Sequence, residues 1–349
     1  MDPDPLNQHV NAGILQTLHE HRLLSADAYA AARARLRQGI AWRRWVGNLL
    51  LVVGVALVLA GIVVYIVANW HALGRYARFA GLETLLFGCA IGAWYAGLEK
   101  PLGRLLLLAA AALVGAVLLL TGITYNTNAE AYEFVAAWAA LVTGFALVSR
   151  FSGMWLFWLT LLNVAFLAWW CAQPDRFLSF KLNDVDQICG ACMGVALLNA
   201  LALAAREIAV GRERPGMAWL AGRESRILPL LAVLIALFIP AAILIVEWPR
   251  GPSGDLLIPA AVLQLVVLAA AFIVYRRAAP DLVTLALCGL SVCGLLLFGV
   301  ARALFDLVKG IEEAYKFLGF GVATLLVFGV AVLWLKHVHT VMTRKDEDE

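Results

Sequence analysis

The sequence contains few charged residues for its length. Asp, Glu, Lys and Arg make up 15% of its 349 residues, whereas they make up about 25% of a soluble globular domain. Hydrophobic residues supply 63%, and a soluble globule of this composition lacks the polar side chains to cover its surface. The composition also excludes a disordered, collagen-like, coiled-coil or small disulfide-bonded chain. The predicted fold class is therefore all-α, a polytopic membrane protein built from transmembrane helices.

Residues that usually carry catalysis are scarce in the apolar segments. All six histidines lie outside these segments, which argues against a haem or a metal held by histidines within the membrane. The sequence has no Walker motif, no nucleophile elbow and no His-Glu-x-x-His motif. We therefore expect no enzyme activity, no cofactor and no metal. The net charge of +3 gives no reason to expect a nucleic acid partner.

Three of the six cysteines lie close together at the outer ends of predicted helices. Cys189 and Cys192 form a C-x-x-C pair, and Cys171 lies across a short loop from them. In an oxidising compartment this arrangement is compatible with thiol–disulfide chemistry. Cysteine is also a small apolar residue that packs well in a protein interior, which is the simpler interpretation. A membrane thiol-redox role is therefore kept as a minor alternative.

Ten segments are long and apolar enough to cross the hydrocarbon core, which needs roughly 20 residues of helix. The weakest is the fourth, which is short and has Glu133 at its start. Together the segments predict a transmembrane bundle over residues 45–336. They cover residues 46–68, 79–98, 102–124, 132–149, 153–171, 187–205, 227–247, 256–275, 282–301 and 318–335.

The distribution of Lys and Arg predicts the orientation of the bundle. With the N-terminus inside, the inner segments carry 19 of the 27 Lys and Arg residues and the outer loops carry 8. Short cytoplasmic loops hold the excess of positive charge in membrane proteins. We therefore expect a multi-pass protein of a bacterial inner membrane, with the lipid bilayer as its main partner and with both termini cytoplasmic.

Both ends of the chain are polar. Residues 1–44 precede the first span, and within them 6–39 show apolar residues at helical spacing, interrupted near Ser25, a suitable N-cap. This pattern predicts a cytoplasmic amphipathic helical hairpin. The hairpin is either a docking element for a second copy or a partner protein, or a segment that lies on the inner leaflet. Residues 337–349 are predicted to form a charged cytoplasmic tail.

Small residues predict where helices approach one another closely. Gly47, Gly54 and Gly61 recur every seven residues in the first span, so they lie on one narrow stripe of the helix. Gly88 and Gly92 form a pair separated by three residues in the second span. Such spacing lets a second helix backbone come near. We expect a tight helix contact at both places.

The remaining polar residues gather near the outer ends of the first four spans. Glu83 lies about one turn inside the second span, where a carboxylate needs a partner. Arg75 or Arg78 is near enough in sequence to supply the counter-charge. The cluster is either an outward-facing ligand pocket or a helix-end network that fixes the loops. The candidate ligand-binding residues are Glu83, Asn69, Trp70, Arg75, Arg78, Tyr125, Asn126, Glu133 and Trp138.

Two segments carry a family resemblance. Ala68-Asn69-Trp70 ends the Gly-rich first span, and Gly122-Ile123-Thr124-Tyr125-Asn126-Thr127 leads to the run AYEFVAAWAAL at 131–141. Roughly residues 10–150 resemble a bacterial membrane protein family catalogued as domain of unknown function 2157. The resemblance implies a polytopic inner-membrane protein with an N-terminal hairpin and implies no known activity. Residues 180–349 match no motif.

Three functions are compatible with these features. The favoured one is a transporter, channel or lipid-handling protein with a polar site that faces the periplasm. The alternative is a non-catalytic membrane scaffold or sensor subunit, because the hairpin and the tail are suited to protein contacts and deep charges are almost missing. Thiol redox chemistry is the minor alternative. A polar cavity that reaches the middle of the membrane favours transport, whereas a solid bundle with a polar rim favours a scaffold.

Overall fold

The computed structural model describes residues 74–172, 184–211, 217–247, 254–278, 281–307 and 312–348, together with single positions between 47 and 64. These residues form helices joined by short turns, and no strand occurs among them. The predicted hairpin, most of the predicted span 46–68, and Asn69 and Trp70 lie outside the described residues.

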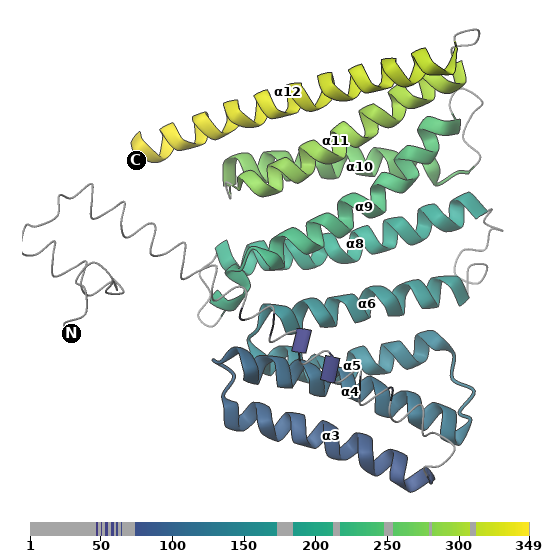
Figure 1. Ribbon diagram of the computed structural model, residues 1–349, viewed down its shortest axis with the longest axis vertical. Coiled ribbons are helices and arrows are strands. Elements are labelled where there is room, and N and C mark those ends of the chain that lie inside the picture. Colours follow the sequence, from purple (N-terminus) through teal and green to yellow (C-terminus); the bar gives the residue numbers. More distant parts are fainter. Residues whose placement is uncertain are drawn as a thin grey trace, which may run out of the picture. The chain divides into compact units, whose positions relative to one another are not determined.

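Nine helices in the described part of the chain are long and apolar enough to cross a membrane (Figure 1). Each coincides with one of the predicted spans from 79–98 onward, so the all-α, polytopic fold class is confirmed. The last helix continues through most of the segment predicted as a tail. The helices are α3 (Arg75–Ala96), α4 (Pro101–Tyr125), α5 (Ala131–Ser149), α6 (Ser152–Ala172), α8 (Asp184–Gly211), α9 (Glu224–Glu247), α10 (Leu257–Ile273), α11 (Leu282–Arg302) and α12 (Glu313–Asp348).

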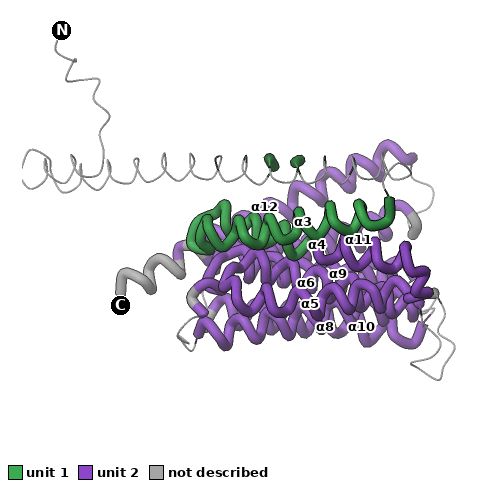
Figure 2. The backbone as a smooth tube through the Cα atoms, turned by 90° about the horizontal axis from the view of Figure 1, so that it is seen from below, with its two compact units in different colours: residues 1–113 green, residues 114–349 purple. Residues whose placement is uncertain are grey.

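The chain divides into two compact units, residues 1–113 and residues 114–349, shown in different colours in Figure 2. In unit 1, α3 turns sharply into α4. Gly97 takes a positive φ of 81° after the last turn of α3, and its amide donates to the carbonyl oxygens of Ala93 and Trp94. The guanidinium of Arg104 donates to the Leu98 carbonyl oxygen at 2.8 Å. These bonds satisfy backbone groups that a helix end leaves open.

In unit 2 the helices pack as successive antiparallel neighbours (Figure 1). The most extensive contacts join α8 to α9 and α5 to α6, and α9 also contacts α10 and α11. Because consecutive helices alternate in direction, α5, α8, α10 and α12 finish at the end of unit 2 where α6, α9 and α11 begin. We call this the basic end, because Arg206, Arg223, Arg226 and Arg276 lie there. The other end of unit 2 is called the opposite end.

The packed interior of unit 2 is built from small and aliphatic side chains. Leu230 and Leu234 of α9 meet Leu268 of α10 and Leu285 of α11, all less than a tenth exposed. The outer surfaces of the helices are apolar as well, most of all on α12, where Leu325 is 76% exposed. Exposed apolar side chains over whole helices are expected where the solvent is hydrocarbon.

Glycines let neighbouring helices approach closely, but only some of these positions are the predicted ones. A Cβ atom built on Gly54 would meet no atom of the described residues within 4 Å, and the same holds for Gly88. Gly92 does meet α4, since its Cβ would lie 3.2 Å from Leu106 Cδ1. In unit 2, by contrast, a Cβ at Gly190 or Gly194 of α8 would collide with aromatic rings of α6. The predicted contact is therefore found at Gly92, and the tighter one on α8 was missed.

Candidate functional site

The structure distributes the predicted site residues over both units. Arg75, Arg78 and Glu83 belong to α3 in unit 1. Tyr125, Asn126, Glu133 and Trp138 belong to unit 2, and Asn69 and Trp70 are outside the described residues. The Glu83 side chain is exposed, and the Arg75 guanidinium lies 5.8 Å from the ring centre of its neighbour Tyr76. The convergence of these residues on one pocket stays a prediction.

Two of the predicted residues line one cavity at the opposite end of unit 2. Asn126 and Glu133 border a space of about 720 Å³ between the end of α4 and the start of α5. The loop turns tightly there because Asn126 and Asn128 adopt the left-handed conformation, with φ of 46° and 51°. Asparagine tolerates that conformation better than most residues. Tyr125 does not line this cavity and is 57% exposed.

The carboxylate of Glu133 caps the start of α5. Its Oε2 accepts a hydrogen bond from the Glu130 amide at 3.3 Å, and the Glu130 side chain accepts one from the Glu133 amide in return. This reciprocal capping satisfies two amides at the start of α5. Trp138 also has a packing role, because its ring covers Gly115 of α4 and meets Phe157 of α6 edge-on at 5.8 Å. Around α5, these contacts fit the helix-end interpretation.

A group of paired charges lies at the basic end of unit 2, where the sequence predicted no site. Glu207 of α8 accepts from the Arg206 guanidinium at 2.8 Å and from Arg226 of α9 at 2.9 Å. Arg226 also pairs with Asp281 at 3.1 Å. Tyr275 donates its hydroxyl to Glu207 at 3.3 Å. Two arginines and two carboxylates thus balance one another among α8, α9 and the start of α11.

Local structure explains why these groups meet. Asp281 is the N-cap of α11, and its Oδ1 accepts from the Val283 amide. A π-helical turn, η3 (Val274–Ala278), follows α10 and places Tyr275 in the interior at 2% exposed. Arg206 is equally buried, and its Nε donates to the Leu220 carbonyl oxygen in the turn before α9. A buried charge network is stable only when all its members are paired, and this one braces the helix ends.

Two polar pairs cross the apolar interior. Asn199 of α8 donates to Asn163 Oδ1 of α6 at 2.7 Å. Gln264 of α10 donates to Ser291 Oγ of α11 at 3.0 Å. Gln264 is completely buried, and its Oε1 atom has no hydrogen-bond partner among the described residues. Such bonds join helices within hydrocarbon, and neither pair belongs to the predicted site.

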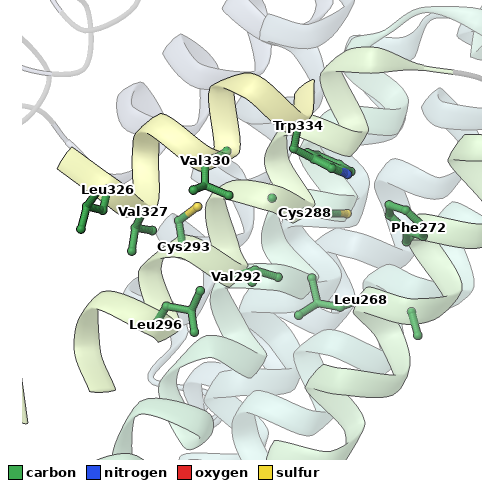
Figure 3. A pocket seen from close by; sticks show the side chains of 13 residues that line it. Leu268, Phe272, Cys288, Val292, Cys293, Leu296, Leu326, Val327, Val330 and Trp334 are labelled. Atoms are coloured by element: carbon green, nitrogen blue, oxygen red, sulfur yellow. The ribbon is translucent and has the colours of Figure 1, made fainter. Parts of the chain in front are cut away.

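An apolar cavity of about 640 Å³ lies between α10, α11 and α12 (Figure 3). Every side chain that lines it is apolar or a cysteine. Its walls include Leu268 and Phe272 of α10, Val292 and Leu296 of α11, and Val330 of α12. Its volume falls within the roughly 300–1,000 Å³ typical of small-molecule sites.

Two aromatic contacts flank this cavity along α12. Trp334 stacks on Phe272 with ring centres 5.9 Å apart, near the basic end. Near the start of α12, Phe317 meets Phe305 edge-on at 4.9 Å. Between these two contacts α12 crosses α11, and valine and leucine side chains line the space that remains.

The cysteines of the C-x-x-C motif are packed in the interior. Cys189 is fully buried against Leu257 and Ala260, and Cys192 is buried with a separate group of side chains around Leu237. All cysteines among the described residues are free, and Cys171 is exposed. This burial fits the interpretation of Cys189 and Cys192 as small apolar residues.

Comparison with known proteins identifies only the N-terminal part of the chain. No curated protein and no solved structure matches the chain. Residues 16–155 match the family model described as "Predicted membrane protein (DUF2157)", which confirms the resemblance found in the sequence.

Proposed function

We propose that this membrane protein handles lipid, and that it takes the acyl chain of a bilayer lipid into the apolar cavity between α10, α11 and α12. The observation that carries the proposal is the lining of the cavity, which is apolar throughout (Figure 3). We further propose a bacterial inner membrane and cytoplasmic termini, on the charge distribution of the loops. The proposed role needs no catalytic step, cofactor or metal.

The position of the cavity supports an acyl chain as its occupant. Each of its walls belongs to a helix that is apolar and long enough to span the membrane. A ligand that reaches such a space from hydrocarbon, without a polar route, is itself apolar. Acyl chains are the abundant apolar molecules of that medium, and the volume suits a small-molecule ligand.

Transport of a polar solute has less support. The cavity between α4 and α5 is lined mostly by apolar side chains, and the Glu133 carboxylate at its edge takes part in capping α5. A non-catalytic scaffold or sensor is the second candidate, and the charge network around Glu207 favours it. Fully paired charges at helix ends make a rigid surface rather than a moving one. The predicted docking role of the N-terminal hairpin belongs to this candidate.

Photo-crosslinking tests the proposal. Protein in vesicles of phosphatidylcholine with a diazirine in the acyl chain is irradiated, and the labelled peptides are mapped by mass spectrometry. We expect labels concentrated around Val292 of α11 and Val330 of α12, and reduced labelling in Val292→Trp, which fills the space. Leu325→Trp is the matched control, because Leu325 lies on α12 outside the cavity lining. Equal labelling in both variants would contradict the proposal.

A further inference from the structure

We infer that the cavity between α10, α11 and α12 binds an anionic phospholipid, whose phosphate lies at Arg276. The inference rests on the proposed function and deepens it, because it names the headgroup as well as the chain. Three observations carry it: the continuity of the cavity with Arg276, the free charge of that side chain, and the aromatic residues at the same end.

Arg276 lies against Phe272, one of the residues that line the cavity. Phe272 lines the cavity, and the Arg276 guanidinium carbon lies 5.5 Å from the centre of its ring. Residues four apart on a helix share one face, so the apolar wall leads into a cation within one turn. A site that is apolar along most of its length and cationic at one end has the polarity of an anionic lipid.

The π-helical turn η3 leaves the Arg276 side chain exposed at the surface. It directs Tyr275 inward, where the hydroxyl donates to Glu207, and leaves the next side chain, Arg276, exposed. The carboxylates of this end, Glu207 and Asp281, are already paired with Arg206 and Arg226. Among the described residues, no ion pair involves Arg276. Its charge is therefore uncompensated at the mouth of an apolar space.

The aromatic pair at this end suits the level of the headgroups. Trp334 stacks on Phe272 at the margin of the cavity (Figure 3), and tryptophan is enriched where hydrocarbon meets headgroups. His337 follows Trp334 by three residues on α12 and is exposed. Arginine binds phosphate oxygens through paired N–H donors. A zwitterionic lipid offers the same phosphate with a compensating cation, so the net negative lipid is preferred.

Native mass spectrometry of the delipidated full-length protein tests this inference. The protein is titrated with an equimolar mixture of phosphatidylglycerol and phosphatidylcholine of different acyl mass. We expect a preference for phosphatidylglycerol of about tenfold, which corresponds to about 1.4 kcal/mol, because its headgroup carries no cation to repel Arg276. Arg276→Gln should remove the preference and keep binding of both lipids. Arg223→Gln, the matched control, changes another exposed arginine of the basic end and should keep the preference.

The cavity variants separate the two proposals. Val292→Trp should lower binding of both lipids, and Val292→Phe, which adds less volume, provides the same test if the tryptophan variant does not fold. If Val292 variants lower binding but Arg276→Gln keeps the preference, the headgroup inference is overturned and the acyl-chain proposal stands. Equal binding of the two lipids to the wild type also overturns it. If the Val292 variants bind as the wild type does, both proposals fail.

Discussion

Arg226 makes two hydrogen bonds to Glu207, one from Nε to Oε1 at 2.9 Å and one from Nη2 to Oε2 at 3.3 Å. This paired geometry fixes the start of α9 against the end of α8. Its third nitrogen, Nη1, donates to Asp281 Oδ2 at the start of α11, so one side chain connects three helix ends. Paired arginine–carboxylate bonds are stronger and more directional than single ones.

Glu207→Gln tests the importance of this network for stability. The change leaves Arg206 buried at 2% exposed with one charge fewer to compensate it. Removing one partner of a buried pair is strongly destabilising. The loss is smaller here because Glu207 is 21% exposed and solvent screens its charge. The free energy of unfolding should fall by about 2–3 kcal/mol, measured by thermal or denaturant unfolding in detergent. Glu312→Gln, an exposed carboxylate, should change it by less than about 0.5 kcal/mol, and equal effects would contradict the role of the network.

Gly194→Ala tests the contact between α8 and α6. A Cβ atom at this position would collide with the ring of Phe166, and overpacking a closely packed interface costs about 1–3 kcal/mol. Gly144→Ala in α5 is the control, since its Cβ would meet nothing within 4 Å and alanine favours a helix. The two variants should shift the unfolding temperature in opposite directions. A stabilised Gly194→Ala protein would show that α6 and α8 are further apart.

The spans could be predicted from the sequence because their apolar length is a local property of the chain. The contacts between helices could not be predicted, because they depend on which faces of two helices meet. Gly47, Gly54 and Gly61 have a clear spacing, yet spacing does not name a partner, and the Gly190–Gly194 pair was overlooked. The capping by Glu133 was missed because the usual signal begins with Ser, Thr, Asp or Asn, and here Glu130 is the N-cap.

The charge network and the apolar cavity were beyond reach of the sequence for a related reason. Arg206 entered the prediction only as a positive charge of a loop, and Glu207 was given no role, although the helix runs on through Gly211. A longer helix in this segment would have indicated that Arg206 and Glu207 lie on α8. Asp281 and Tyr275 reach the same place only through a π-helical turn, which no local pattern indicated. The cavity depends on where α12 crosses α11, and this part of the chain resembles no known motif.

Ser291→Ala and Gln264→Leu should differ although they remove the same hydrogen bond. Ser291→Ala leaves a completely buried Gln264 without its remaining partner, and an unpaired buried amide costs about 1–3 kcal/mol. Gln264→Leu removes the amide with little change in volume, including the oxygen that has no partner among the described residues. Its effect should be close to zero. Measured unfolding free energies in the reverse order would show that a further group bonds to Gln264.

The predicted orientation can be tested with two single cysteines. Met217 lies in the turn before α9 at the basic end and is 38% exposed, and Asp255 is exposed at the opposite end. In a background in which the exposed Cys171 is serine, an impermeant maleimide should label Asp255→Cys in intact cells. Met217→Cys should react only after the membrane is permeabilised, because the charge distribution places that end inside. Labelling of Met217→Cys in intact cells would show that the orientation is the opposite of the predicted one.

Glu133 offers a test between the two interpretations of the outer polar residues. A capping carboxylate can be replaced by glutamine, which keeps an oxygen to accept from the Glu130 amide. Glu133→Gln should therefore unfold as the wild type does, whereas Glu133→Ala should lose about 0.5–2 kcal/mol. If the residue binds a cationic ligand instead, glutamine also removes the charge that attracts it, and growth or transport assays should show a defect in a stable protein. Because capping needs only the oxygen and ligand binding needs the charge, a stable and fully active Glu133→Gln protein removes Glu133 from the candidate site.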